Sequence, residues 1–144
     1  MGKKAPHITA AELKIMKILW RIGSGTVRDV LDALAADGES PAYTTVMTLM
    51  NQLGDKGAVS VDRRRQPFVY QPAVRREQVL GDRIAQFVQT VFDGQAGELV
   101  LRLVEQGNLS PEDLRRIEAR IEARERLEGA KDAPPSPRKK GGKP

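Results

Sequence analysis

The 144-residue chain contains no cysteine and only one histidine, His7. Without cysteine it can form neither a disulfide bond nor a thiolate site for a metal or for redox chemistry. One histidine cannot build a typical zinc site or a Ser/His/Asp triad. Carboxylates are plentiful, but none belongs to a recognisable nucleophile, metal-binding or phosphate-loop motif. We therefore expect neither an enzyme nor a metal site or a cofactor.

Long apolar segments are also missing, and no run is long enough to span a bilayer. The N-terminus, Met1-Gly2-Lys3-Lys4, is not followed by the apolar region of a signal peptide. The sequence therefore predicts no membrane insertion and a cytoplasmic location. A length of 144 residues, 40% of them hydrophobic, is enough for one full domain or two small ones.

The net charge of +5 is unevenly distributed along the chain. Residues 1–75 hold 11 Lys and Arg against 7 Asp and Glu, and residues 76–130 hold 8 against 11. Residues 131–144 hold 5 against 1. The basic charge thus lies on the first part and on the tail, and the middle is acidic, which favours one half that contacts nucleic acid and another that contacts protein.

The most informative segment is 43–53, whose pattern predicts a helix. Its apolar stripe follows the spacing i, i+3, i+4, i+7: Val46, Leu49, Met50 and Leu53. The opposite face carries short uncharged polar side chains instead of the Lys and Glu of an ordinary solvated face: Thr44, Thr45, Thr48, Asn51 and Gln52. Hydroxyls and amides can pair with base edges in the major groove, and a Thr methyl can pack on a thymine methyl. The alternative is an ordinary surface helix that happens to be rich in Thr.

Two further helices are predicted upstream. The nearer one begins after Thr26, a good N-cap with Asp29 three residues later, and ends at the breaker segment 37–41. Its apolar stripe is Val27, Val30, Leu31 and Leu34. Together with segment 43–53 it forms a helix-turn-helix pattern. The earlier helix starts at a capping box of Thr9 and Glu12, and its Trp20 is interpreted as a core residue, with ligand stacking as the alternative.

Two short strands follow the helix 43–53, which Lys56-Gly57 ends. They are expected at 59–62 and at 67–70, the second stopping before Pro72. The loop between them holds three consecutive arginines, Arg63, Arg64 and Arg65. Like charges repel, so folding explains them poorly, whereas a nearby phosphate backbone explains them well. The pattern predicts the wing of a winged helix, and the alternative is a solvated loop that only improves solubility.

Residues 76–128 are predicted to be helical throughout, with one helix from about Arg76 to Phe92, a short helix ended by Gly107-Asn108, and a third begun by Ser110-Pro111. Their narrow apolar stripes form a weak core alone. This part is therefore interpreted as a dimerisation domain, with an intramolecular three-helix bundle as the alternative. The expected dimer contacts are Ile84, Phe87, Val88, Leu99, Leu103, Leu114, Ile117 and Ile121. Residues 129–144 lack periodicity and predict a disordered basic tail after domains 1–75 and 76–128.

From about Ile8 to Ile121 these motifs resemble those of the penicillinase-repressor (BlaI/MecI/CopY) family of bacterial transcription regulators. The resemblance is carried by Thr9-Ala10-Ala11-Glu12-Leu13, by Thr26-Val27-Arg28-Asp29-Val30, by Ala42-Tyr43-Thr44-Thr45-Val46-Met47-Thr48, and by Lys56-Gly57 and Phe68-Val69-Tyr70. It implies an N-terminal winged helix domain, a helical C-terminal dimerisation domain and repression through a palindromic DNA operator. The expected DNA contacts are Thr44, Thr45, Thr48, Gln52, Arg63, Arg64 and Arg65.

The sequence also departs from the family pattern. Family members often carry Arg where Gln52 stands. The copper-responsive branch has a C-terminal cysteine motif. Because this chain lacks that motif, metal sensing is not expected. The antibiotic-responsive branch is cleaved at an Asn-Phe bond where this chain reads Leu101-Arg102-Leu103. A membrane sensor protease or another inducing factor is the further partner that the resemblance implies.

The leading hypothesis is thus a mainly α, homodimeric, sequence-specific repressor whose helix 43–53 enters the major groove. The alternative is a winged helix that serves as a protein–protein interaction module and reads no DNA sequence. Three consecutive arginines in the wing and an uncharged Thr face favour the first hypothesis.

Overall fold

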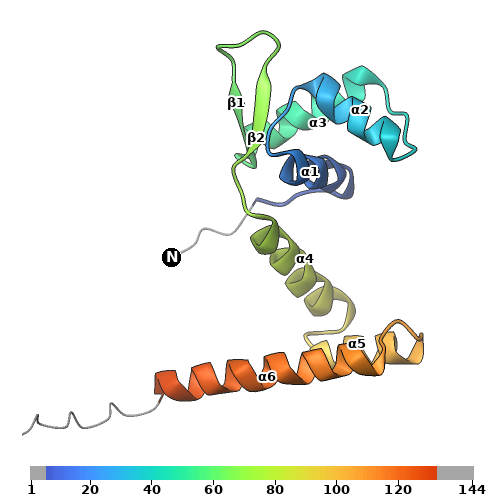
Figure 1. The fold of residues 1–144 in the computed structure, drawn as a ribbon, viewed down its shortest axis with the longest axis vertical. Coiled ribbons are helices and arrows are strands. Elements are labelled where there is room, and N and C mark those ends of the chain that lie inside the picture. Colours follow the sequence, from blue (N-terminus) through green and yellow to red (C-terminus); the bar gives the residue numbers. More distant parts are fainter. Residues whose placement is uncertain (1–5, 133–144) are drawn as a thin grey trace, which may run out of the picture. The chain divides into compact units, whose positions relative to one another are not determined.

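The computed structural model describes residues 6–132, which form helices and one two-stranded sheet (Figure 1). The elements are α1 (Ala10–Ile22), α2 (Val27–Ala36), α3 (Tyr43–Asp55), β1 (Val59–Asp62), β2 (Val69–Pro72), α4 (Arg76–Val91), α5 (Ala96–Glu105) and α6 (Pro111–Asp132). They belong to two compact units, one ending at Gly94 and the other beginning at Gln95. The predicted fold class is confirmed: a winged helix-turn-helix is followed by further helices. Within residues 6–132, no helix is long and apolar enough to cross a bilayer.

Local capping sets the start of α1 and of α2. The Thr9 hydroxyl accepts from the Glu12 backbone N–H at 3.1 Å, and the Glu12 carboxylate accepts from the Thr9 N–H at 2.9 Å. Thr26 and Asp29 form the same reciprocal pair at 3.1 and 3.0 Å. Each such cap stabilises its helix by about 1 kcal/mol. The two predicted helix starts are therefore confirmed.

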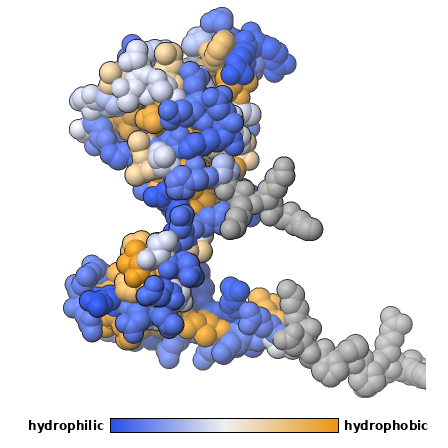
Figure 2. Space-filling model, turned by 180° about the vertical axis from the view of Figure 1, so that it is seen from behind, coloured by the Kyte–Doolittle hydropathy of each residue, from blue (hydrophilic) through white to orange (hydrophobic). Residues whose placement is uncertain are grey.

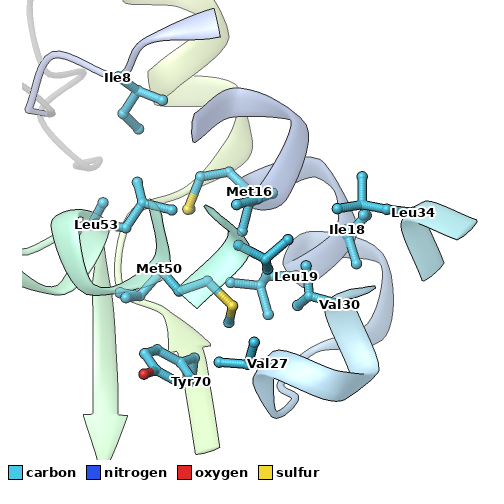
Figure 3. Packing of buried hydrophobic residues seen from close by; sticks show 14 of the residues in the cluster. Ile8, Met16, Ile18, Leu19, Val27, Val30, Leu34, Met50, Leu53 and Tyr70 are labelled. Carbon is cyan, nitrogen blue, oxygen red and sulfur yellow. The ribbon is translucent and has the colours of Figure 1, made fainter. Parts of the chain in front are cut away.

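The core of the first unit lies where the apolar stripes of α1, α2 and α3 meet the inner face of β2 (Figure 3). Met16 and Leu19 come from α1, Val30 from α2, Met50 from α3, and Tyr70 from β2. All five side chains are buried. Because α1, α2 and α3 all contribute side chains to this core, packing within the first unit fixes α2 and α3 relative to one another.

The wing is an antiparallel hairpin that extends away from the helices (Figure 1). Its register pairs Val59 with Pro72 and Asp62 with Val69. The first strand confirms the prediction, but the second runs from Val69 to Pro72 instead of from 67 to 70. Pro72 fits because it occupies the last pair of the ladder, where its missing N–H matters least.

A short bridge ties β2 to the segment between α1 and α2. The Gly25 N–H donates to the Tyr70 carbonyl at 2.9 Å, and the Tyr70 N–H donates back at 2.8 Å. A Cβ at Gly25 would lie only 2.9 Å from Ile22 Cδ1. A side chain at this position would displace that of the exposed Ile22 and crowd Asp29 Cβ at 3.1 Å, so glycine is favoured where the wing approaches the helix-turn-helix.

The first unit extends beyond the predicted boundary at residue 75, because α4 packs against its core. Val79 of α4 is buried in that core. Just before α4, the Val74 carbonyl accepts a 3.0 Å hydrogen bond from the Trp20 indole N–H. Trp20 is partly buried and packs against the core, as expected of a core residue rather than a ligand-stacking one.

In the second unit, α5 is followed by α6, whose start is capped as predicted. The Ser110 hydroxyl accepts from the Asp113 N–H at 3.1 Å, and Asp113 accepts from the Ser110 N–H at 3.0 Å. The helix continues to Asp132, so the predicted disordered tail from residue 129 is wrong for its first four residues. Ala and Lys favour helix there, and the first prolines come only at 134 and 135. The rest of that tail lies outside the described residues.

Candidate nucleic-acid interface

The polar face of α3 points away from the core. Val46, Met50 and Leu53 are fully buried and Leu49 is half-buried, as the predicted stripe requires. The predicted base-reading residues on the opposite face are all exposed: Thr44, Thr45, Thr48 and Gln52. This helix therefore offers hydroxyl and amide groups to a partner while its other face is anchored in the protein.

Two large side chains that sequence reasoning did not select flank these polar groups. Tyr43 is 45% exposed and Met47 is 37% exposed, although both belong to α3. The Arg28 guanidinium, at the start of α2, lies 5.9 Å from the centroid of the Tyr43 ring. The sequence alone shows that Tyr43 and Met47 lie off the apolar stripe. It does not show the pairing of Arg28 with Tyr43, because that pairing depends on how α2 and α3 pack.

A hydrogen bond links α3 to the wing. The Tyr70 hydroxyl donates to Asn51 Oδ1 at 3.0 Å. Burial raises the pKa of the Tyr70 phenol, an effect that the nearby Arg63 opposes, so the group remains a donor at neutral pH. Of the polar residues assigned to this face, Asn51 thus has a partner within the protein and fixes the wing relative to the helix.

The three wing arginines lie at the hairpin turn, where the sequence places them, and each has a partner within the wing. Arg63 lies over the Phe68 ring, 5.7 Å from its centroid. Arg64 Nε donates to Asp62 Oδ1 at 3.1 Å, and Arg65 Nε lies 3.8 Å from Asp62 Oδ2. The hydrogen bond from Arg64 holds the pKa of Asp62 below its ordinary value. Exposed ion pairs of this kind are weak, so both arginines can exchange the carboxylate for a phosphate.

A groove of about 510 Å³ lies between the start of α2, the exposed edge of α3 and the wing. Its lining includes Arg28, Tyr43, Met47, Asn51, Pro67 and Phe68. Arg28, which lines the groove, lies over Tyr43, and Arg63 lies over Phe68, another lining residue. The groove combines positive charge with apolar surface beside the polar face of α3.

An ion pair between the buried Glu12 and the partly exposed Lys56 holds the end of α3 against the start of α1. Lys56 Nζ lies 2.5 Å from Glu12 Oε1 and donates to the His7 carbonyl at 2.9 Å. Burial raises the pKa of Glu12, but the hydrogen bonds from Lys56 and from the Thr9 backbone outweigh it, so the pKa falls below the ordinary value. The Glu12 carboxylate is therefore ionised at neutral pH.

Comparison with known proteins identifies the family. The model of the penicillinase repressor family matches residues 8–123. The chain belongs to the penicillinase repressor family. This member is 28% identical over 116 residues to the penicillinase repressor of Bacillus licheniformis, a match that covers 80% of this chain and 89% of the relative. It is 25% identical over 118 residues to the methicillin resistance regulatory protein MecI of Mammaliicoccus sciuri, covering 81% and 94%.

Two solved structures of the repressor BlaI also match this family member. The solution structure of the BlaI DNA-binding domain is 30% identical, with a TM-score of 0.46, and the match covers 54% of this chain and 93% of that one. The monomeric Bacillus licheniformis form in complex with the blaP half-operator is 30% identical, with a TM-score of 0.45 and the same coverage. Membership of the family makes this chain a DNA-binding transcriptional repressor with a winged helix.

Proposed function

We propose that this repressor acts as a homodimer that inserts α3 into the major groove of a palindromic operator. The observation that carries the proposal is the exposed, uncharged polar face of α3 beside an arginine-bearing wing. Thr and Gln side chains can donate to and accept from base edges, which lets them distinguish sequences. Arginines in the wing supply phosphate contacts, which position the protein without reading sequence.

Within this proposal, Thr44, Thr45, Thr48 and Gln52 face the base edges. Arg64 and Arg65 leave Asp62 and bind successive phosphates, while Arg63 approaches the backbone from its place over Phe68. The exchange is easy because the Asp62 pairs are exposed to solvent. The carboxylate also offsets part of the positive charge of Arg64 and Arg65 in the free wing.

Dimerisation is supported by apolar side chains that the single chain leaves uncovered. Among the expected contacts, Ile84, Phe87, Leu114 and Ile121 are exposed. The others are half-buried: Val88, Leu99, Leu103 and Ile117. In Figure 2, hydrophobic side chains interrupt the hydrophilic surface of the part that carries α5 and α6. Large apolar side chains left exposed in this way are typical of an interface between protein chains.

Release from DNA is assigned to an inducing factor such as a membrane sensor protease. The segment Leu101–Leu103, which stands where the antibiotic-responsive branch is cleaved, lies inside α5. A protease needs extended backbone, so cleavage there requires α5 to unwind first. We therefore favour an inducing factor that changes the C-terminal unit before, or instead of, cutting it.

The decisive experiment compares specific with non-specific binding. In vitro selection from a randomised duplex library first provides a bound sequence, and fluorescence anisotropy then measures its affinity and that of a scrambled duplex. Thr45→Ala and Thr48→Ala should each weaken binding to the selected duplex by about 1–3 kcal/mol and change binding to the scrambled duplex much less.

The matched control is Thr90→Ala, the same substitution on α4, which should leave both affinities unchanged. Equal losses on both duplexes would show that the Thr face does not read sequence. Failure to enrich any sequence from the library would overturn sequence-specific recognition as a whole and favour a protein-binding role for the winged helix.

A further inference from the structure

Met47 occupies an unusual position on α3. The core stripe of this helix is already complete with Val46, Met50 and Leu53, all fully buried. Met47 is 37% exposed and shares the edge of the helix with Tyr43 and Asn51, four residues to either side. Its side chain therefore contributes little to the core and lines the groove beside the polar face instead.

The surroundings of Met47 indicate what this groove binds. Arg28 lines the groove over Tyr43, and Arg63 lies over the lining residue Phe68, so positive charge is close to the groove, which suits a strand with phosphates. Between them, Tyr43, Met47 and Phe68 supply apolar surface. A nucleic-acid strand in this groove would thus meet apolar side chains next to its charged backbone.

We propose that Met47 reads a thymine by packing against its 5-methyl group in the major groove. This inference rests on the proposed insertion of α3 into DNA. The 5-methyl of thymine is the only apolar group that the four bases present in that groove. Methionine suits such a contact because its thioether chain is flexible and polarisable and can follow an irregular surface. Met47 would therefore determine specificity without any hydrogen bond.

Neighbouring contacts hold the side chain in place for this role. Tyr43 is restrained by Arg28, and Asn51 is tied to Tyr70 of the wing, so both flanks of Met47 on α3 are fixed. Tyr43 and Asn51 border the space into which the Met47 side chain extends.

The test uses the duplex that the wild-type protein selects from a randomised library. Each thymine in one half-site is replaced in turn by deoxyuridine, which removes the 5-methyl group and keeps every hydrogen-bonding group. Wild-type protein should lose about fourfold in affinity at one thymine, the factor that corresponds to one buried methyl at roughly 0.8 kcal/mol. Met47→Ala should bind the unmodified duplex about fourfold more weakly and show no deoxyuridine effect at that thymine.

Two variants make the result specific to this side chain. Met47→Leu keeps apolar bulk and should keep the deoxyuridine effect. Thr45→Ala weakens binding but should retain the fourfold ratio at the thymine assigned to Met47. Persistence of that ratio in Met47→Ala, or its absence at every thymine in the wild type, overturns the inference while leaving sequence-specific binding intact. Failure to select any sequence would instead remove the proposed function on which the inference rests.

Discussion

At the scale of single residues, the pair Glu12–Lys56 carries the sharpest consequence for stability. The Glu12 side chain is 1% exposed and that of Lys56 32%, so the carboxylate depends on its partner. Lys56→Met should lower the free energy of unfolding at pH 7 by about 3 kcal/mol. This is the lower end of the usual loss when one partner of a buried ion pair is removed, because Lys56 is partly solvated. Urea unfolding followed by the fluorescence of Trp20, the only tryptophan, measures this change.

The same pair predicts the direction of a pH effect. Because the pKa of Glu12 is lowered in the folded state, its contribution is fully present above the ordinary value of 4.5 and is lost as the pH falls through the folded pKa. The deficit of Lys56→Met should therefore be largest at neutral pH and shrink below about pH 4.5. Lys14→Met, which breaks the pair with Glu39 between side chains 59% and 41% exposed, should cost at most about 1 kcal/mol. A similar loss in both variants would mean that burial of Glu12 is unimportant.

Which residues could be predicted from sequence depended on the range of their contacts. The capping pair of Thr26 with Asp29 is three residues apart and has a recognisable pattern. The contact of Glu12 with Lys56 spans 44 residues, and the contact of Asn51 with Tyr70 spans 19. Partners so far apart become neighbours only after helices pack, so composition and periodicity contain no signal for them.

At the scale of elements, the wing offers a test of its electrostatic role. Arg64→Ala should weaken binding to specific and scrambled duplexes alike, because a phosphate contact carries no sequence information. It should also reduce the slope of log affinity against log salt by about 0.9, the value for one phosphate contact. Anisotropy titrations over a series of salt concentrations measure this slope.

Two further variants test whether the effect comes from the charge of the wing. Asp62→Asn removes the carboxylate that holds Arg64 and Arg65, so binding to every duplex should strengthen. Arg102→Ala removes an exposed arginine from α5 and should leave the slope unchanged. If Arg64→Ala also leaves it unchanged, the arginine stays in solvent or on Asp62 when DNA binds.

Element boundaries were predicted well where a local pattern starts or stops a helix, and less well elsewhere. The segment 43–53 has both an apolar stripe and a Gly at its end, where Gly57 adopts a φ of +79°. The second strand is shifted by two residues, because its register follows from pairing with Val59–Asp62 and not from its own composition. An apolar stripe on α4 likewise indicates a buried face without indicating that Val79 packs against the winged helix.

At the scale of the whole molecule, charge and hydrophobicity divide the chain into parts to which the proposed function assigns different tasks. The first 75 residues carry a basic excess and the exposed polar face of α3. Residues 76–130 carry an acidic excess, and several large apolar side chains remain exposed there. A chain that binds DNA with one part and a second copy of itself with the other can engage both halves of a palindrome.

This division predicts that a charge in the apolar stripe of α6 separates the subunits. Leu114→Glu or Ile117→Glu removes apolar surface that we assign to the dimer contact and places an unpaired charge there. Sedimentation velocity at micromolar concentration should show monomers, whereas Arg115→Glu, which adds the same side chain at an exposed neighbouring position, should remain dimeric.

The separated monomers should retain a folded winged helix, because the first unit has its own core around Met16, Leu19, Val30 and Met50. Thermal unfolding of that unit should thus be little changed. Binding to a palindromic duplex should fall far more than binding to a single half-site, since each monomer loses the gain from linked engagement of two half-sites. If Leu114→Glu still sediments as a dimer, the interface lies elsewhere and the assignment of the α6 stripe is wrong. If it is monomeric yet binds the palindrome as tightly as before, dimerisation does not contribute to operator binding.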